Sequence, residues 1–192
     1  MLTDAYATIR WNGTPLATSN YHLDIKFEIA LPFAFRFHGV NYTTAHFCSN
    51  GWFSFGADPG DFYYFNTTLP TTAMPNAAIY PFWDDLVLDL GTWPDGQLLK
   101  HTTGTSPNRV FIVEWHQLRA FGTTTDHRVV FQIKLYETSN AFEILYDVVN
   151  WIGGASFSAT IGYENADGTQ GGDIGTTFID PPTTGYRCVP GI

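Results

Sequence analysis

Apolar and polar residues alternate along several stretches of this chain, and no long window shows the period of an amphipathic helix. Within Arg128–Tyr136, every second residue from Val129 to Leu135 is apolar, whereas Gln132 and Lys134 lie between them. Because side chains two positions apart share one face of a strand, this stretch predicts a strand with one buried face. The same alternation occurs in Leu31–Phe37, Ala141–Tyr146 and Phe157–Tyr163, and Arg109–His116 is apolar on parts of both faces.

Turn-forming residues separate these stretches, as at Asn50-Gly51, Asp95-Gly96 and Asp167-Gly168. Thr138–Asn140 lies between two alternating stretches, so it predicts a hairpin turn. Many short strands with turns roughly every ten residues are typical of an antiparallel sandwich. We therefore predict one all-β domain over residues 1–192, an antiparallel two-sheet β-sandwich of jelly-roll type with little or no helix. Residues 180–192 are predicted to form an extended C-terminal tail.

The composition agrees with a β domain and narrows the class of partner. Aromatic residues make up 17% of the chain and charged residues only 14%, and aromatic side chains suit a pleated, half-buried surface. A formal net charge of −9 would repel nucleic-acid phosphates and an anionic membrane surface. No apolar run approaches the length of a membrane span, so we expect no membrane insertion. The acidic balance suits a secreted protein, a calcium binder or simply a soluble protein.

Five sequence blocks follow one another in a distinctive order, and they include a Leu-Pro-Phe strand, a Ser-Asn-Gly hairpin and a Trp-Asp-Asp-Leu stretch. The blocks are Leu31–Tyr42, Cys48–Phe55, Pro75–Leu86, Val110–Trp115 and Phe131–Glu137. They resemble the nidogen-like domain, the related domain of plexin-domain-containing proteins, and modules of secreted bacterial proteins. The resemblance runs from about residue 31 to residue 168 and leaves residues 1–30 outside it. It implies a β domain in an extracellular or cell-surface protein.

Two adjacent carboxylates, Asp84 and Asp85, follow the apolar stretch Ile79–Trp83. Successive strand residues point to opposite faces, so both can face one ligand only if the strand has ended there. A loop at this point would present oxygen ligands to Ca²⁺, with Asp89 nearby in sequence. The calcium hypothesis therefore names Asp84, Asp85 and Asp89. The alternative is structural, with one aspartate accepting backbone N–H bonds in a turn and the other solvated.

Several aromatic residues stand in turn-like or weakly patterned surroundings, where they can stack on sugar rings or anchor a protein contact. Asp61–Phe65 is the strongest such segment, because five consecutive residues cannot all point inward. The alternative for each of these aromatic residues is that it caps the core. The ligand-binding hypothesis names Tyr63, Tyr64, Trp93 and Trp151.

The two cysteines, Cys48 and Cys188, are too few for a disulfide framework and lack the spacing of a zinc site. They either form one predicted disulfide, which would tie the chain's end to an early strand, or remain buried small apolar residues. Asn12, Asn41 and Asn66 each begin a glycosylation sequon, which matters only in a eukaryotic secreted protein.

The chain carries no nucleophile elbow and no HExxH motif, and its histidines are scattered. Our first hypothesis is a noncatalytic extracellular module that recognises a protein or a glycan. A second is a structural subunit of a filament or surface layer, in which the strand-like Tyr6–Trp11 pairs with a neighbour's sheet edge. A third is a glycan-active enzyme, which requires two facing carboxylates, with Glu114 and Glu137 as the candidate pair.

Overall fold

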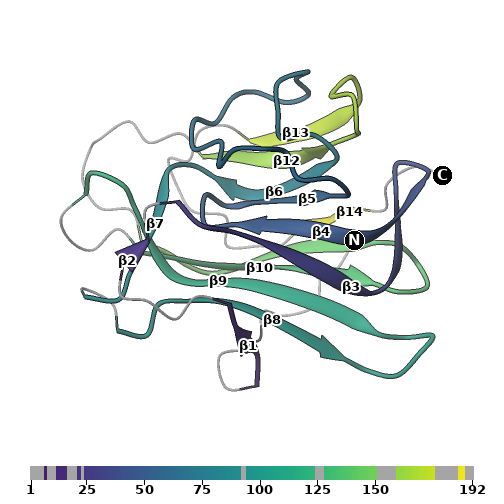
Figure 1. Ribbon diagram of the computed structural model, residues 1–192, viewed down its shortest axis with the longest axis horizontal. Helices are drawn as coiled ribbons and strands as arrows, with labels where there is room; N and C mark the ends of the chain where they lie inside the picture. The colour runs from purple at the N-terminus through teal and green to yellow at the C-terminus, as the bar shows by residue number, and fades with distance from the viewer. Residues whose placement is uncertain are drawn as a thin grey trace.

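The computed structural model describes residues 7, 12–16, 21–22, 24–91, 94–123, 128–150, 159–175 and 186–188. Within these ranges the regular secondary structure is entirely β, with fourteen strands and no helix. The strands form two antiparallel sheets that stack as two layers (Figure 1). The predicted all-β, two-sheet sandwich is therefore confirmed.

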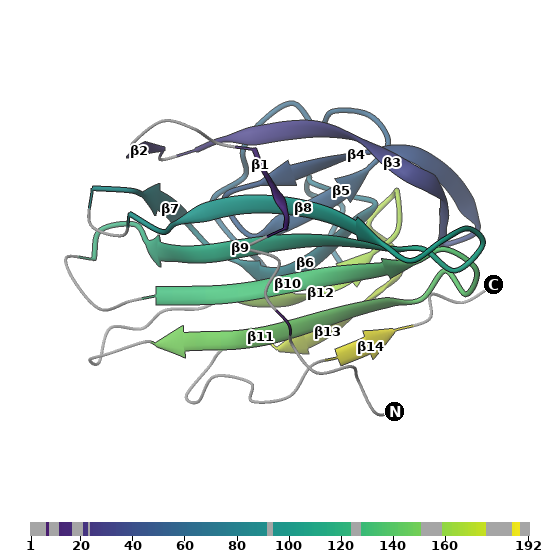
Figure 2. The ribbon, with the colours of Figure 1, turned by 90° about the horizontal axis from the view of Figure 1, so that it is seen from below.

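The first sheet has the strand order β1-β8-β9-β10-β11-β14, and β7 joins it at β9 and also pairs with β2. Figure 2 looks onto this sheet. Its strands are β1 (Thr14–Pro15), β2 (Tyr21–His22), β7 (Leu86–Asp89), β8 (Gln97–Thr103), β9 (Val110–Ala120), β10 (Arg128–Tyr136), β11 (Phe142–Asn150) and β14 (Tyr186–Cys188).

The second sheet has the strand order β13-β12-β6-β5-β4-β3, so β3 and β13 are its edge strands. Its strands are β3 (Lys26–Phe37), β4 (Val40–Cys48), β5 (Trp52–Phe55), β6 (Ala78–Trp83), β12 (Thr160–Glu164) and β13 (Gly171–Gly175).

Tight turns fix the registers of neighbouring strands. His38 and Gly39, both with positive φ, form the two-residue turn that joins β3 to β4, as a right-handed strand twist requires. Asn140, also at positive φ, donates its backbone N–H to the Tyr136 carbonyl in the turn between β10 and β11. The predicted hairpin at Thr138–Asn140 is confirmed.

The main core lies between the two sheets. It contains the apolar residues of the alternating stretches, such as Val129, Phe131, Ile133 and Leu135 of β10. Trp115 and Phe131 of the first sheet stack with ring centroids 4.8 Å apart. Phe47 of the second sheet meets the Trp115 ring edge-on at 4.3 Å, so aromatic contacts join the two layers directly.

A second, smaller cluster lies on the other side of the second sheet. It is built from residues of β4, β5 and β6, including Cys48, Trp52, Tyr80 and Trp83, with Leu69 from the long connection between β5 and β6. Phe62 and Tyr63 of the same connection pack against it. Folding this connection back over the sheet buries two tryptophans that would otherwise face solvent.

Candidate functional site

A single buried side chain, that of Asn50 in the turn between β4 and β5, joins three segments of the chain. Its Nδ2 donates to the Asp24 carboxylate at 2.6 Å and to the Phe62 carbonyl at 3.3 Å. Its Oδ1 accepts the backbone N–H of Leu86 at 3.0 Å. Its backbone carbonyl accepts the N–H of Asp84 at 3.3 Å. The turn therefore brings the predicted aromatic segment and the predicted aspartate pair to one place.

Gly51, the next residue, allows this turn to lie directly against β6. Its φ is +73°, and a Cβ at this position would lie 1.8 Å from the Phe82 carbonyl oxygen. Any larger residue would displace the turn from the sheet, so glycine is required here by both conformation and space.

The aromatic segment after the turn is held by its backbone carbonyls. The indole N–H of Trp52 donates to the Phe62 carbonyl at 2.8 Å, and the indole N–H of Trp83 donates to the Tyr63 carbonyl at 2.6 Å. The Tyr63 hydroxyl donates to the Pro59 carbonyl at 2.8 Å. Both tryptophans are fully buried, so they fix the loop on a rigid support.

This support displays two aromatic side chains to solvent. Tyr64 is 41% exposed and Phe65 is 79% exposed, and their ring centroids are 4.4 Å apart with the planes 43° apart. Tyr63, in contrast, is partly buried and packs against the second cluster. The exposed pair is thus Tyr64 and Phe65. Phe65 is not one of the predicted contact residues, although the five consecutive residues Asp61–Phe65 cannot all point inward.

The aspartate corner is partly buried and crowded with like charge. Asp84 Oδ1 accepts the N–H of Asp85 at 2.8 Å, while Oδ2 is buried and has no hydrogen-bond partner among the described residues. Burial raises the pKa of Asp84 to about 6. Burial, and then the charge of Asp24, also raises the pKa of Asp85. Asp24, which the sequence did not single out, therefore belongs to this corner.

Asp89, the third predicted calcium ligand, forms an ion pair with Arg119. Its Oδ2 accepts from Arg119 Nε and Nη2, both at 3.0 Å, and its Oδ1 accepts from the N–H of Gly91 at 3.1 Å. In the described part of the chain, no group of three or more His, Cys, Asp or Glu side chains is placed to hold a metal ion. The structure therefore does not assemble the expected Asp84, Asp85 and Asp89 set.

Of the two alternatives for Cys48 and Cys188, the disulfide is not formed, and both thiols are free. Cys48 belongs to the cluster on the outer side of the second sheet, where burial raises its pKa to about 12. Cys188, on β14 of the first sheet, packs against the main core. The two sulfurs thus belong to different clusters, which the spacing of cysteines along the chain does not reveal.

Trp93 and Trp151, the other two predicted contact residues, lie outside the described residues. Most of the strand-like Tyr6–Trp11 also lies outside them. Ala7 is described, and its carbonyl accepts from Gln132 Nε2 at 3.2 Å.

The candidate catalytic carboxylates, Glu114 and Glu137, do not face each other. Glu114 is buried on β9 opposite Gln132, whose amide donates to it at 3.0 Å. Glu137 lies five residues beyond Gln132, which is roughly 16 Å along the strand and on the opposite face. A glycosidase pair requires about 5–10 Å. The structure therefore gives no support to this pair.

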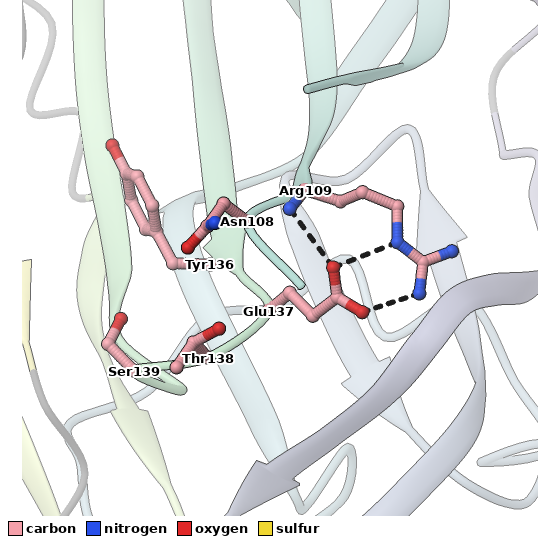
Figure 3. Close-up of a pocket in the computed structure, with 6 residues that line it drawn as sticks. All are labelled: Asn108, Arg109, Tyr136, Glu137, Thr138 and Ser139. Carbon is pink, nitrogen blue, oxygen red and sulfur yellow. Dashed lines mark hydrogen bonds and ion pairs between the residues drawn. The ribbon is translucent and has the colours of Figure 1, made fainter. Parts of the chain in front are cut away.

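Glu137 instead forms a structural link at one end of the sandwich. Arg109 binds it through Nε to Oε2 at 2.9 Å and through Nη2 to Oε1 at 2.5 Å (Figure 3). This ion pair lowers the pKa of Glu137 to about 2. Arg109 Nη1 also donates to the Pro32 carbonyl of β3 at 2.6 Å, so the pair joins the two sheets.

A pocket of about 200 Å³ lies beside this pair, and Asn108, Thr138 and Ser139 contribute to its lining. The ring of Tyr136, which also lines it, points away from the ion pair (Figure 3), and its hydroxyl donates to Glu143 at 2.7 Å. The only charged groups in the lining, Arg109 and Glu137, form an ion pair with each other. The pocket therefore has no unpaired charge with which to bind a ligand.

A family model described as NIDO related matches residues 2–182. The chain belongs to this nidogen-like family. Nidogen-like domains are typically extracellular. The match extends at both ends beyond the stretch from residue 31 to 168 that carries the sequence blocks. Comparison with curated proteins and with solved structures found no match. No helix in the described part of the chain is long and apolar enough to cross a membrane.

The sequence blocks that resemble nidogen-like domains have clear physical roles in this member of the NIDO-related family. Ser49 Oγ accepts the N–H of Ile25 at 3.1 Å, and Asn50 and Gly51 build the central turn. Trp83 holds the aromatic segment, and the backbone N–H of Leu86 is bound by Asn50. These blocks therefore shape the support beneath the exposed aromatic pair.

Proposed function

We propose that this domain is a noncatalytic binding module of an extracellular protein, and that Tyr64 and Phe65 contact a partner protein. The observation that supports this most is the combination of high exposure and a fixed backbone. Phe65 is 79% exposed, yet the adjoining carbonyls of Phe62 and Tyr63 are held by buried tryptophans.

The energetics favour a contact at this loop. Burying an aromatic side chain of this size contributes about 1.5–3 kcal/mol, so two neighbouring rings can act as an anchor. A loop that is already ordered loses less conformational entropy when it binds. The exposed Asp61 in the same segment would favour a partner that carries positive charge around an apolar pocket, whereas Asp58 is already paired with Lys26.

The shape of the pair favours a protein over a glycan. Sugar rings stack on flat aromatic surfaces, whereas the two rings here are inclined by 43° and form a wedge. Phe65 also has no polar group with which to bind sugar hydroxyls. A wedge of this kind fits a recess between side chains of a partner protein.

The experiment compares the wild-type domain with a Tyr64→Ser/Phe65→Ser double variant. Both are immobilised and exposed to surface and extracellular proteins of the source cells, and captured proteins are then purified and titrated one by one. The Val40→Ser variant, altered at an exposed residue on β4, is the control. We expect a purified partner to bind the wild type and Val40→Ser about a hundredfold more tightly than the double variant.

Equal binding by the double variant would contradict the proposal. A parallel glycan array with the same three proteins tests the other ligand class. Glycan binding that requires Tyr64 and Phe65 would replace the protein partner by a carbohydrate.

A further inference from the structure

The twelve-residue strand β3 is an edge of the second sheet, and one half of that edge is capped. Pro32 has no N–H to offer, and its carbonyl already accepts from Arg109 Nη1 at 2.6 Å. The backbone N–H of Arg36 donates to Asn140 Oδ1 at 2.8 Å. Side chains from the first sheet's turns therefore block strand pairing along this half, a common protection of natural sheet edges.

The other half of the edge, residues 26–30, is open. The backbone of Ile25 bonds to Ser49 of the neighbouring turn, and the groups of an antiparallel strand alternate in direction. Phe27 and Ile29 therefore face β4, whereas the N–H and C=O groups of Glu28 and Ala30 point away from it. Both residues are exposed, and no described residue pairs with the strand on this side.

A groove of about 170 Å³ lies at the Ala30 end of this open half, where it meets the capped half. Ala30 and Pro32 contribute one wall and Lys100–Thr102 of β8 the other, and Phe111 and Thr14 of β1 also line it. The strand β3 runs alongside β8 in Figure 2, and residues of both strands line the groove. Because β1 has only two residues and ends its pairing at Lys100, β8 beyond Lys100 has no described partner on this side.

The charge in the groove indicates the chemistry of an occupant. Lys100 and His101 line it, and no described carboxylate forms an ion pair with either of them. Along β8, Lys100 lies two positions from the core residue Leu98, so its side chain is directed to the space between the sheets. An added strand beside β3 would turn every second side chain toward this lysine.

We propose that the open half of β3 binds an extended segment of a partner protein by strand addition, and that this segment places a carboxylate against Lys100. Main-chain bonds to Glu28 and Ala30 provide the pairing, and the lysine selects the charge of the inward-facing side chain. The groove does not include the Tyr64–Phe65 loop, so this interaction is independent of the aromatic contact.

The test uses two blocked heptapeptides of alternating Thr and Val, in which the central Val is replaced by Glu in one and by Lys in the other. Each is titrated into the ¹⁵N-labelled domain and followed by amide chemical shifts. We expect shifts at Glu28 and Ala30, and about tenfold tighter binding of the Glu peptide.

Two charge-reversal variants distinguish a specific contact with Lys100 from an effect of the domain's overall charge. Lys100→Glu is expected to reverse the preference, so that the Lys peptide binds more tightly. Arg36→Glu makes the same charge change on the capped half of β3 and is expected to keep the wild-type preference. Ala30→Pro, which removes an outward N–H, is expected to weaken both peptides, with circular dichroism and melting to verify its fold.

Three results would overturn the proposal. The first is equal affinity for the two peptides, and the second is the absence of shifts at Glu28 and Ala30 at millimolar peptide. The third is a dimer in sedimentation that already occupies these amides without peptide, since the occupant would then be a second copy of the chain.

Discussion

The indole N–H of Trp83 donates to the backbone carbonyl of Tyr63 at 2.6 Å, and this bond connects the aspartate corner to the exposed aromatic pair. Trp83 immediately precedes Asp84, and Tyr63 immediately precedes Tyr64. Two features twenty residues apart in sequence thus share one rigid support. The position of the aromatic pair therefore depends on the buried side chain of Trp83.

Replacing Trp83 with Phe should loosen this support. The variant keeps a ring against Tyr80 but leaves the Tyr63 carbonyl without its donor, which we expect to cost about 2–4 kcal/mol of unfolding free energy. Urea unfolding measures the loss, and hydrogen exchange should accelerate at residues 62–65. Tyr136→Phe removes a hydroxyl hydrogen bond to Glu143 on the first sheet, which lies outside this cluster, so it serves as the control. Faster exchange in both variants would indicate a general loss of stability.

The glycine of the central turn should be intolerant of even one methyl group. In Gly51→Ala the added Cβ would overlap the Phe82 carbonyl at 1.8 Å, so we expect a loss of more than about 4 kcal/mol or a failure to fold. Gly39→Ala has a similar φ of +81° but no atom within 4 Å, and it should cost only about 1 kcal/mol. Thermal unfolding compares the two variants, and similar losses would contradict the steric explanation.

Stability should respond to pH through Asp84. Because its folded pKa is raised to about 6, the folded state holds a proton that the unfolded state releases near pH 4. Wild-type stability should therefore fall as pH rises from about 4 through about 6. Asp84→Asn removes the charge and keeps the acceptor for Asp85, so it should be more stable than wild type by about 1–2 kcal/mol at pH 7.5 and similar at pH 4.

Urea unfolding between these pH values measures both proteins. Asp58→Asn gives the opposite sign, since a hydrogen bond from Lys26 lowers the pKa of Asp58. It should destabilise the domain above pH 4, with the difference disappearing as pH falls further. A pH-independent gain in Asp84→Asn would show that the carboxylate carries no such cost.

Calcium binding at the adjacent carboxylates Asp84 and Asp85 stays a prediction. Asp85 feels the like charges of Asp24 and Asp84, whereas Asp89 is bound to Arg119, and no described group of three such side chains is placed to hold a metal ion. We expect Ca²⁺ to raise the melting temperature by about 2–5 °C, and chelation to reverse this. Asp84→Asn should abolish the calcium shift, and Asp89→Asn should keep it. Equal melting temperatures with calcium and with chelator would exclude a structural Ca²⁺ here.

The alternation of apolar residues predicted parts of β3, β9, β10, β11 and β12, and together with the turn signals it predicted the sandwich. Arg128–Tyr136 and Phe142–Asn150 form neighbouring strands because their inward residues fill one core, and Asn140 supplies the turn between them. Local sequence carries this information, since strand period and turn chemistry are properties of a few consecutive residues. The aromatic segment Asp61–Phe65 and the pair Asp84 and Asp85 are likewise recognisable from a few consecutive residues.

What the sequence alone could not determine was which of these polar and aromatic groups meet. Asp24 lies at the aspartate corner because it accepts a hydrogen bond from Asn50, whereas Asp89 is bound to Arg119. Glu114 and Glu137 lie on opposite faces of the first sheet. Trp52 and Trp83 bind the backbone carbonyls of Phe62 and Tyr63. With the backbone held in this way, the Tyr63 side chain packs inward and the Phe65 side chain faces solvent. The sequence determined a nidogen-like β-sandwich, and only the tertiary structure decided its surface, since long-range hydrogen bonds and packing between distant strands have no local signature.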